Sequence, residues 1–274
     1  MKKLKFSKII LEWFEYLPER YANKTVELYT AVLKDFQLNL PSDLPIIDIT
    51  PSHIKVYIDY LKSTNHANST CNRYLEILKS FFHWLSNNYQ IEKPTKHIRH
   101  LKELPPKARC LDQDEYQTIL KVTSGVENAA FQFLANTGLR RNEFRFLTYD
   151  RIKSDFIYVL GKGNKQRYIP LNNVCKQIIS QYPQNGQDQP AFISAFSYRE
   201  QLYIACQKLA KQLDIPPFGP HSFRHYFATQ LIRKGVPLIK VSKLLGHSSV
   251  IITEKIYVHL VPMDFSGLTD CLEI

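Results

Sequence analysis

The sequence lacks the features that would place the protein in a membrane or outside the cell. No apolar run approaches the roughly 20 residues that a bilayer-spanning helix needs, and the basic N-terminus leads into Lys8 and Glu12 without an apolar signal segment. The five cysteines are odd in number, widely spaced and free of any Cys-x-x-Cys pair, so the sequence predicts neither a disulfide framework nor a zinc site. We therefore expect reduced thiols, a cytoplasmic location, and neither a metal nor another cofactor.

Acidic residues are also fewer than basic residues. The chain has 36 Lys and Arg against 25 Asp and Glu, a formal net charge of +11. Residues 1–106 hold 15 basic and 11 acidic side chains, and residues 107–274 hold 21 and 14. Because both halves are basic, each is suited to contact a polyanion such as DNA. A merely soluble basic protein would carry the same charge, so the polyanion needs a more specific signal.

The first hundred residues carry apolar residues at the helical spacing of three and four. Stripes of this kind begin at Phe6, Val26, Ile54 and Tyr74, and the third follows Thr50-Pro51, a capping residue with proline at the first helical position. This pattern predicts a small helical bundle over residues 1–100. The following stretch is basic and contains Leu104-Pro105-Pro106-Lys107, which disfavours helix, so we expect a linker over residues 101–110.

Residues 111–274 are expected to form a second domain that is mostly helical. Its first helix starts at Asp112, with Glu115 three residues on as a capping box. Two β-branched and aromatic runs, residues 156–160 and 168–171, flank a glycine-rich turn and predict a small antiparallel β-hairpin. Further helices are expected around residues 172–182, 198–213, 222–234 and 238–245. The fold class is therefore mainly α, an N-terminal helical bundle plus a mostly α domain with one hairpin.

Four separated segments of the second domain hold polar residues suited to phosphoryl transfer. They are Thr137-Gly138-Leu139-Arg140-Arg141-Asn142-Glu143, Gly161-Lys162-Gly163-Asn164-Lys165, Pro220-His221-Ser222-Phe223-Arg224-His225, and Leu244-Leu245-Gly246-His247 followed by Tyr257. Cutting DNA with a side chain requires donors for the charge that the phosphorus gains in the transition state. Arginine supplies a permanently charged, planar fork of donors, which suits Arg140 and Arg224.

The remaining residues of this set match the other chemical requirements. The leaving 5′ oxygen needs a general acid, and Lys162 on the glycine turn could reach it. Tyr257 would need its proton removed or its phenolate stabilised, for which His221 and His247 are the candidates. Taken singly, each residue has a simpler explanation, such as an Arg140 surface ion pair or one packed tyrosine among 16. A catalytic role is favoured only because all of these residues occur together and in this order.

Taken together, the motifs resemble the tyrosine recombinase (phage integrase) family, particularly its Xer-like and integron-integrase-like members. The resemblance spans the whole second domain. In the first domain, residues 68–73 followed by Phe81-Phe82-x-Trp84-Leu85 are similar to the last helices of the family's SAM-like core-binding domain. One spacing departs from the family, which usually sets the tyrosine roughly nine residues after the histidine. Here Tyr257 lies ten residues after His247.

The resemblance implies a role for each matching residue. Arg140 and Arg224 would clamp the phosphate, Lys162 would protonate the leaving oxygen, and Tyr257 would be the nucleophile. His221 and His247 would assist, and Glu143 would support the helix of the first arginine. For His225 we expect core packing or a phosphate contact, without a catalytic role. The expected DNA-binding residues are Thr70, Asn72, Arg73, Arg141, Lys165 and Arg167.

The function expected from this resemblance is site-specific DNA recombination through a 3′-phosphotyrosyl intermediate. It implies a homotetramer assembled on two double-stranded DNA sites with inverted repeats, with accessory DNA-bending or directionality proteins as possible partners. The apolar tail from Met263 to Ile274 would dock on a neighbouring subunit or pack on its own domain. Two alternatives share part of the pattern: a type IB topoisomerase or telomere resolvase, and a DNA-binding protein with a vestigial active site.

Overall fold

The computed structural model describes residues 6–42, 44–103, 109–161, 166–182 and 201–257. The chain divides into two compact units, Met1–Pro106 and Lys107–Ile274. The turn containing Lys162 and Lys165 and the tail after Tyr257 lie outside the described residues. Within the described ranges, no helix combines the length and apolar character needed to cross a bilayer.

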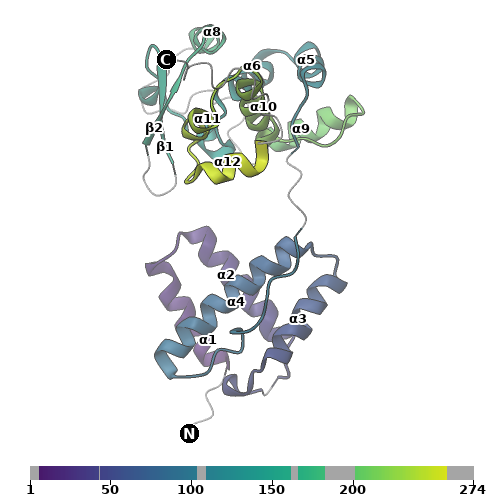
Figure 1. Cartoon of the computed structure of the whole chain (residues 1–274), viewed down its shortest axis with the longest axis vertical. Coiled ribbons are helices and arrows are strands. Elements are labelled where there is room, and N and C mark those ends of the chain that lie inside the picture. The colour runs from purple at the N-terminus through teal and green to yellow at the C-terminus, as the bar shows by residue number, and fades with distance from the viewer. Residues whose placement is uncertain (1–5, 43, 104–108, 162–165, 183–200, 258–274) are drawn as a thin grey trace, which may run out of the picture. The chain divides into compact units, whose positions relative to one another are not determined.

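The N-terminal unit is a bundle of helices in which α4 is central (Figure 1). Its elements are α1 (Phe6–Tyr16), η1 (Leu17–Glu19), α2 (Asn23–Leu38), η2 (Ile46–Asp48), α3 (Pro51–Ser63) and α4 (Asn68–Tyr89). Helix α4 packs against both α2 and α3, and α1 packs against α2. As the sequence predicts, α3 begins at Pro51, and the backbone N–H of Thr50 donates to Nδ1 of His53 at 3.1 Å.

Aromatic side chains interlock the helices of this bundle. Trp13 of α1 meets Phe81 of α4 edge-on, with ring centroids 5.7 Å apart, and Phe36 of α2 meets Tyr57 of α3 at 5.1 Å. The Tyr57 hydroxyl donates to Asp35 at 2.6 Å, which satisfies the one polar atom of that buried ring. Edge-to-face pairs of this kind stabilise a core by roughly 0.5–1.5 kcal/mol each beyond the burial of apolar area.

The C-terminal unit contains the predicted helices and the predicted hairpin. Its elements are α5 (Gln113–Val122), α6 (Gly125–Thr137), α7 (Arg141–Arg145), η3 (Tyr149–Arg151), β1 (Phe156–Leu160), β2 (Gln166–Pro170), α8 (Asn173–Gln181), α9 (Gln201–Gln212), α10 (Pro220–Arg233), α11 (Leu238–Leu245) and α12 (Val250–Tyr257). Strands β1 and β2 pair antiparallel, with Phe156 opposite Pro170 and Leu160 opposite Gln166. The capping box at Asp112 and Glu115 is present. The mainly α fold class is confirmed.

Helix α6 is the centre of the C-terminal unit, packed between α8 and α10. Phe131 of α6 stacks on Phe223 of α10 at a centroid distance of 4.9 Å. The helix ends at Gly138, whose φ is +62°, and a Cβ atom there would lie 2.4 Å from the Phe227 ring. Glycine is therefore required both by the left-handed backbone and by the close approach of α10. This turn directs the chain into Arg140.

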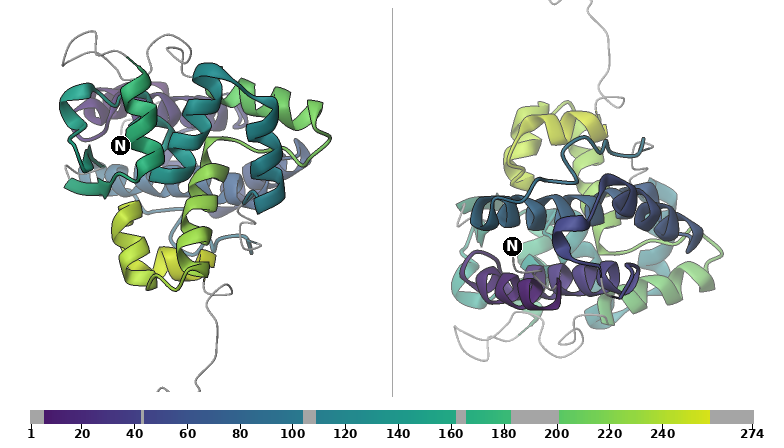
Figure 2. Two further views of the ribbon diagram at one scale, coloured as in Figure 1. Left: turned by 90° about the horizontal axis from the view of Figure 1, so that it is seen from above. Right: turned by 90° about the horizontal axis from the view of Figure 1, so that it is seen from below.

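Helices α11 and α12 form a smaller hydrophobic cluster with the end of α10, separate from the main core of the unit. Its members include Phe227 on α10, Val241 and Leu245 on α11, and Tyr257 on α12. In Figure 2 (left), α11 and α12 lie to one side of the other helices of the C-terminal unit. Because α11 also packs against β2 and α12, it connects the hairpin to the helix that carries Tyr257.

Candidate active site

Arg140 lies immediately before α7, where Glu143 folds back onto it. One oxygen of the Glu143 carboxylate accepts the Arg140 backbone N–H at 2.7 Å, and the other accepts guanidinium Nη1 at 2.8 Å. The ion pair that the spacing predicts is therefore present. It leaves Nη2 of Arg140 to donate to the carbonyl oxygen of Gly246 at 2.8 Å. Glu143 thus aims the guanidinium at the end of α11.

Arg224, on α10, points to the same end of α11 from the interior. Its side chain is buried, Nη1 donates to the carbonyl of Gly138 at 2.7 Å, and Nη2 donates to the carbonyl of Leu245 at 2.6 Å. Burial and the nearby charge of Arg140 lower the pKa of Arg224 to about 9. The guanidinium therefore stays charged at neutral pH.

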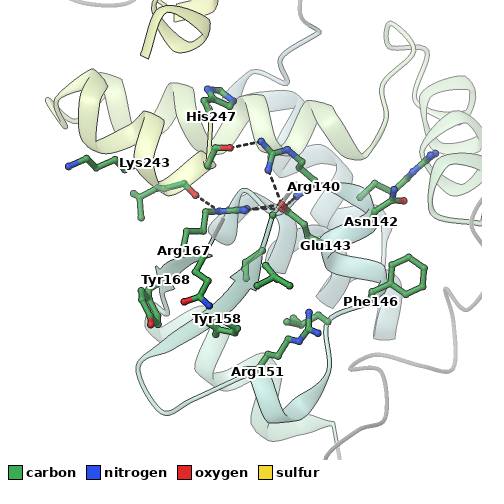
Figure 3. A pocket seen from close by; sticks show the side chains of 18 of the residues that line it. Arg140, Asn142, Glu143, Phe146, Arg151, Tyr158, Arg167, Tyr168, Lys243 and His247 are labelled. Atoms are coloured by element: carbon green, nitrogen blue, oxygen red, sulfur yellow. Dashed lines mark hydrogen bonds and ion pairs between the residues drawn. The ribbon is translucent and has the colours of Figure 1, made fainter. Parts of the chain in front are cut away.

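Arg167, on β2, completes this arrangement. Both of its Nη atoms donate to the Glu143 carboxylate at 2.8 and 2.7 Å, and its Nε donates to the carbonyl of Leu244 at 2.8 Å. Figure 3 shows Arg140 and Arg167 meeting at Glu143. Burial alone would raise the pKa of Glu143, but the hydrogen bonds and charges of Arg167 and Arg140 outweigh it and lower the pKa to about 2.

Three successive carbonyl groups at the end of α11 therefore receive three guanidinium groups. Leu244, Leu245 and Gly246 accept from Arg167, Arg224 and Arg140 respectively. The last carbonyls of a helix have no partner within it and carry the negative end of its dipole, so cations stabilise them. Gly246 has φ +65°, and a Cβ there would lie 2.9 Å from the Arg167 side chain. Any larger residue at position 246, immediately before His247, would therefore collide with Arg167.

Both predicted histidines lie beside these arginines, in different surroundings. Nδ1 of His247 is 2.7 Å from the hydroxyl of Thr253, a fully buried residue of α12. Burial and the charges of Arg224 and Arg140 lower the pKa of His247 to about 4. His221, at the start of α10, is accessible from the surface; partial enclosure and the charge of Arg224 lower its pKa as well. Both rings are therefore favoured in the neutral form.

Tyr257 is the last residue of α12 and is only 3% exposed. Its hydroxyl lies 2.5 Å from Nδ1 of His225 on α10, and burial raises the pKa of Tyr257. His225 is the residue that sequence reasoning missed, since it was expected to pack or to touch phosphate. The available signal was its position four residues after His221, which places both histidines on one face of α10.

A groove of about 1230 Å³ opens beside Arg140 and the two predicted histidines. Its lining includes Arg140, His221 and His247 together with four further basic side chains, Arg141, Arg151, Arg167 and Lys243. The acidic side chain in the lining, Glu143, is neutralised by its two arginine partners. The described ends of the hairpin turn, Leu160, Gly161 and Gln166, also line the groove, whereas Lys162 and Lys165 lie outside the described residues. The groove is thus suited to a polyanion.

The predicted DNA-binding residues fall into two groups. Arg73 is exposed, and Thr70 and Arg141 are partly exposed. Asn72, in contrast, is 6% exposed; its amide accepts the N–H of Leu101 at 2.8 Å and donates to the Leu101 carbonyl at 2.9 Å. Asn72, like the buried Arg167, therefore has hydrogen-bond partners within the protein, and the DNA contacts expected of both residues stay predictions. Asn72 therefore holds the backbone around Leu101 against α4.

The pairing of Glu143 with two arginines predicts acid sensitivity. The folded-state pKa of Glu143 is about 2, below the ordinary value of about 4.3, so its contribution is present above pH 4.3 and is lost as the pH falls towards 2. The difference corresponds to about 3 kcal/mol. Urea unfolding at pH 6 and pH 3 should show a smaller loss of stability on acidification in Glu143→Gln than in the wild type. Equal losses would contradict this role of the carboxylate.

Comparison with known proteins agrees with this architecture. A sequence model described as the phage integrase family matches residues 109–263, and one described as phage integrase, N-terminal SAM-like domain, matches residues 10–88. Tyrosine recombinase XerD of Halalkalibacterium halodurans is 27% identical over 271 residues, covering 90% of each protein.

Two solved structures share the fold. A dimer of lambda integrase residues 75–356 bound to a COC′ core site has a TM-score of 0.78 at 19% identity, and the match covers 96% of this chain and 97% of that integrase chain. A lambda integrase tetramer bound to a Holliday junction has a TM-score of 0.76 at 19% identity, covering 90% and 78% respectively. At such low identity the likeness concerns the fold alone.

Together, the fold and the site define an enzyme that exchanges DNA strands, of the tyrosine recombinase class. The chain belongs to the phage integrase family. The predicted resemblance is thereby confirmed for both units of the chain.

Proposed function

We propose that this recombinase cuts each strand by attack of Tyr257 on a DNA phosphate, leaving a 3′-phosphotyrosyl bond and a free 5′-hydroxyl. The observation that carries the proposal is the convergence of Arg140 and Arg224 on adjacent carbonyls of α11, at 2.8 and 2.6 Å. Two positive charges are thereby held at the end of α11, and that of Arg140 lines the groove. A phosphodiester placed there would have both arginines near its non-bridging oxygens.

The guanidinium groups keep donors for this purpose. Each Nη atom carries two N–H groups, and the hydrogen bonds described for Arg140 and Arg224 use one partner per Nη. The second N–H of each Nη remains for a phosphate oxygen. Donors held in place before the reaction stabilise the developing charge without reorganisation. The carbonyls of α11 are thus the groups that hold the arginines ready.

Lys162 is proposed as the general acid for the leaving 5′ oxygen. Gly161 and Gln166, the nearest described residues on either side of its turn, both line the groove. His221 and His247 are proposed to contact the phosphate, since both rings border the same groove. Because the released 5′-hydroxyl of a partner duplex can attack the phosphotyrosine in turn, the bond energy is conserved and strands are rejoined without a nucleotide cofactor.

DNA is proposed to contact both units of the chain. Residues 1–100 would bind one part of the site through Thr70 and Arg73, and residues 111–274 would hold the cleaved phosphate, with Arg141 and Lys165 on the flanking backbone. Phosphate contacts would supply most of the affinity and make binding fall steeply with salt. Exchange between two duplexes requires four cleavages, so we infer a homotetramer on two inverted-repeat sites. Accessory proteins and a cytoplasmic location remain part of this proposal.

The test is a trapping assay on nicked DNA that carries inverted repeats from beside the gene. We expect a denaturant-resistant protein–DNA adduct with a free 5′-hydroxyl on the released fragment, and peptide mapping should place the DNA on Tyr257. Specific binding without an adduct would instead favour a vestigial active site. Relaxation of any supercoiled plasmid, without preference for the repeats, would favour a topoisomerase.

A further inference from the structure

The hydroxyl group of Tyr257 has a defined partner within the protein. It lies 2.5 Å from Nδ1 of His225, with the two rings 5.8 Å apart and tilted by 50°. Tyr257 is 3% exposed, so the contact is shielded from water. When the imidazole carries its proton on Nε2, the Tyr257 hydroxyl donates a hydrogen bond directly to Nδ1 of His225.

The other two histidines of the site, His221 and His247, have other surroundings. Nδ1 of His247 is already paired with the Thr253 hydroxyl at 2.7 Å. His221 borders the groove that would receive DNA. Within the described part of the chain, neither ring makes a hydrogen bond with Tyr257. Geometry decides first among candidates for a general base, and it favours His225.

We propose that His225 is a catalytic residue of the strand-cutting reaction, accepting the proton of Tyr257 on Nδ1 as the nucleophile attacks. The inference rests on the proposed function, because it concerns the same attack on phosphorus. It assigns proton removal to a histidine that neither the motif spacing nor the family resemblance singled out.

The Oη–H bond of Tyr257 breaks and its proton moves to Nδ1 of His225, while Oη forms a bond to phosphorus. The phosphorus–O5′ bond breaks, and the departing oxygen takes a proton from a separate acid, proposed to be Lys162. Rejoining reverses each transfer: the incoming 5′-hydroxyl loses its proton, and His225 returns its own proton to Tyr257. No oxidant, reductant or further reactant takes part.

The charge state of His225 agrees with this role. Burial, His221 and the charge of Arg224 lower the pKa of His225 to about 4, so the ring is neutral at pH 7 and one of its nitrogens has a lone pair that can accept a proton. A pKa this low makes a weak base in the absence of DNA. A phosphodiester anion entering beside Arg224 would favour the protonated ring and raise that pKa. Proton removal would thus be linked to occupation of the site by DNA.

Helix α12 sets the geometry of both contacts at once. Thr253 and Tyr257 are four residues apart, so their side chains project from the same face of the helix. Thr253 holds His247, and Tyr257 meets His225. One rigid turn of helix therefore places the nucleophile against its base and orients the histidine that follows Gly246.

The first test compares His225→Ala and His225→Asn with the wild type in single-turnover cleavage of the nicked substrate. Asparagine can still hydrogen-bond to Tyr257 but cannot take up a proton at neutral pH. Since general base catalysis contributes about 10²- to 10⁴-fold, we expect losses of that order in both variants, with DNA binding retained. Recovery of near wild-type rates by His225→Asn would reduce His225 to a positioning residue and overturn the proposal.

A sulfur-substituted substrate separates proton removal from proton donation. When sulfur replaces the bridging 5′ oxygen, the leaving group needs no general acid. We expect Lys162→Ala to be rescued by this substrate and His225→Ala to remain slow. Rescue of His225→Ala would mean that the histidine acts on the leaving group, which would also overturn the proposal.

In a third experiment, Tyr257 is replaced with a fluorinated tyrosine whose phenol has a lower pKa. A more acidic nucleophile needs less help from a base, so the defect of His225→Ala should shrink by about tenfold or more. A purely structural defect would not respond to the acidity of the nucleophile. Formation of the adduct by the wild type is measured in parallel. If the wild type forms no adduct, the proposed function fails. If the wild type forms it and His225→Ala cleaves at the wild-type rate, only the role of His225 is refuted.

Discussion

The Tyr257→Phe variant is expected to bind its DNA site as the wild type does and to form no covalent adduct. The substitution removes one hydroxyl oxygen, and the ring keeps its place against Phe227 and Leu245 in the cluster of α10, α11 and α12. His225 loses its partner, which costs about 1–3 kcal/mol of folding stability if Nδ1 stays buried without a hydrogen bond. The protein should therefore fold and bind but not cut.

The measurement pairs an electrophoretic binding assay with the trapping assay on nicked DNA. Tyr203→Phe is the matched control, since Tyr203 lies exposed on α9 and outside the groove lining. This control should form the adduct at the wild-type rate. An adduct in Tyr257→Phe would show that another residue attacks the phosphate, and it would remove the basis for both proposals.

The Arg224→Lys variant is expected to lower the cleavage rate by about 10²- to 10³-fold, the usual effect of losing one preorganised donor to a transition-state oxyanion. Arg224 bridges the carbonyls of Gly138 and Leu245 through separate nitrogens, at 2.7 and 2.6 Å. A lysine has a single ammonium nitrogen and no planar fork. It cannot span both carbonyls and also meet a phosphate oxygen.

Single-turnover cleavage at saturating protein separates this effect from weaker binding. Arg233→Lys, at the exposed end of the same helix, conserves charge in the same way and should leave the rate unchanged. Thermal unfolding of both variants reports any loss of stability. A wild-type cleavage rate in Arg224→Lys would mean that charge alone suffices and that the fork geometry is not used.

Much of the fold follows from local patterns in the sequence. Apolar residues at helical spacing predict the bundle, and the β-branched runs predict the hairpin, although β2 begins at Gln166, earlier than the expected residue 168. Glycine at positions 138 and 246 is explained by positive φ values of 62° and 65° together with the close approach of Phe227 and Arg167. Helical periodicity and turn conformation are visible in sequence because they depend on neighbouring residues along the chain, whereas the approach of Phe227 and Arg167 depends on the tertiary fold.

Arg167 illustrates a signal that the strand pattern contained but motif matching did not use. Side chains alternate between faces along a strand, so Arg167 shares a face with the fully buried Ile169. An arginine on that face requires a buried acceptor. The carboxylate of Glu143, 24 positions earlier in the chain, is that acceptor. Its identity could not be read from the spacing, because no local rule relates the start of α7 to β2.

The contrast between features that the sequence specifies and features that depend on tertiary packing is clearest at Tyr257. The motifs place a tyrosine after two arginines and three histidines, in an order typical of one enzyme family. Which histidine meets the tyrosine hydroxyl depends on tertiary packing. Apolar contacts pack α12 against α10 and α11, and burial of apolar surface is non-directional. Helical periodicity therefore specifies which residues share a face, whereas the meeting of two faces depends on the packing of the whole cluster.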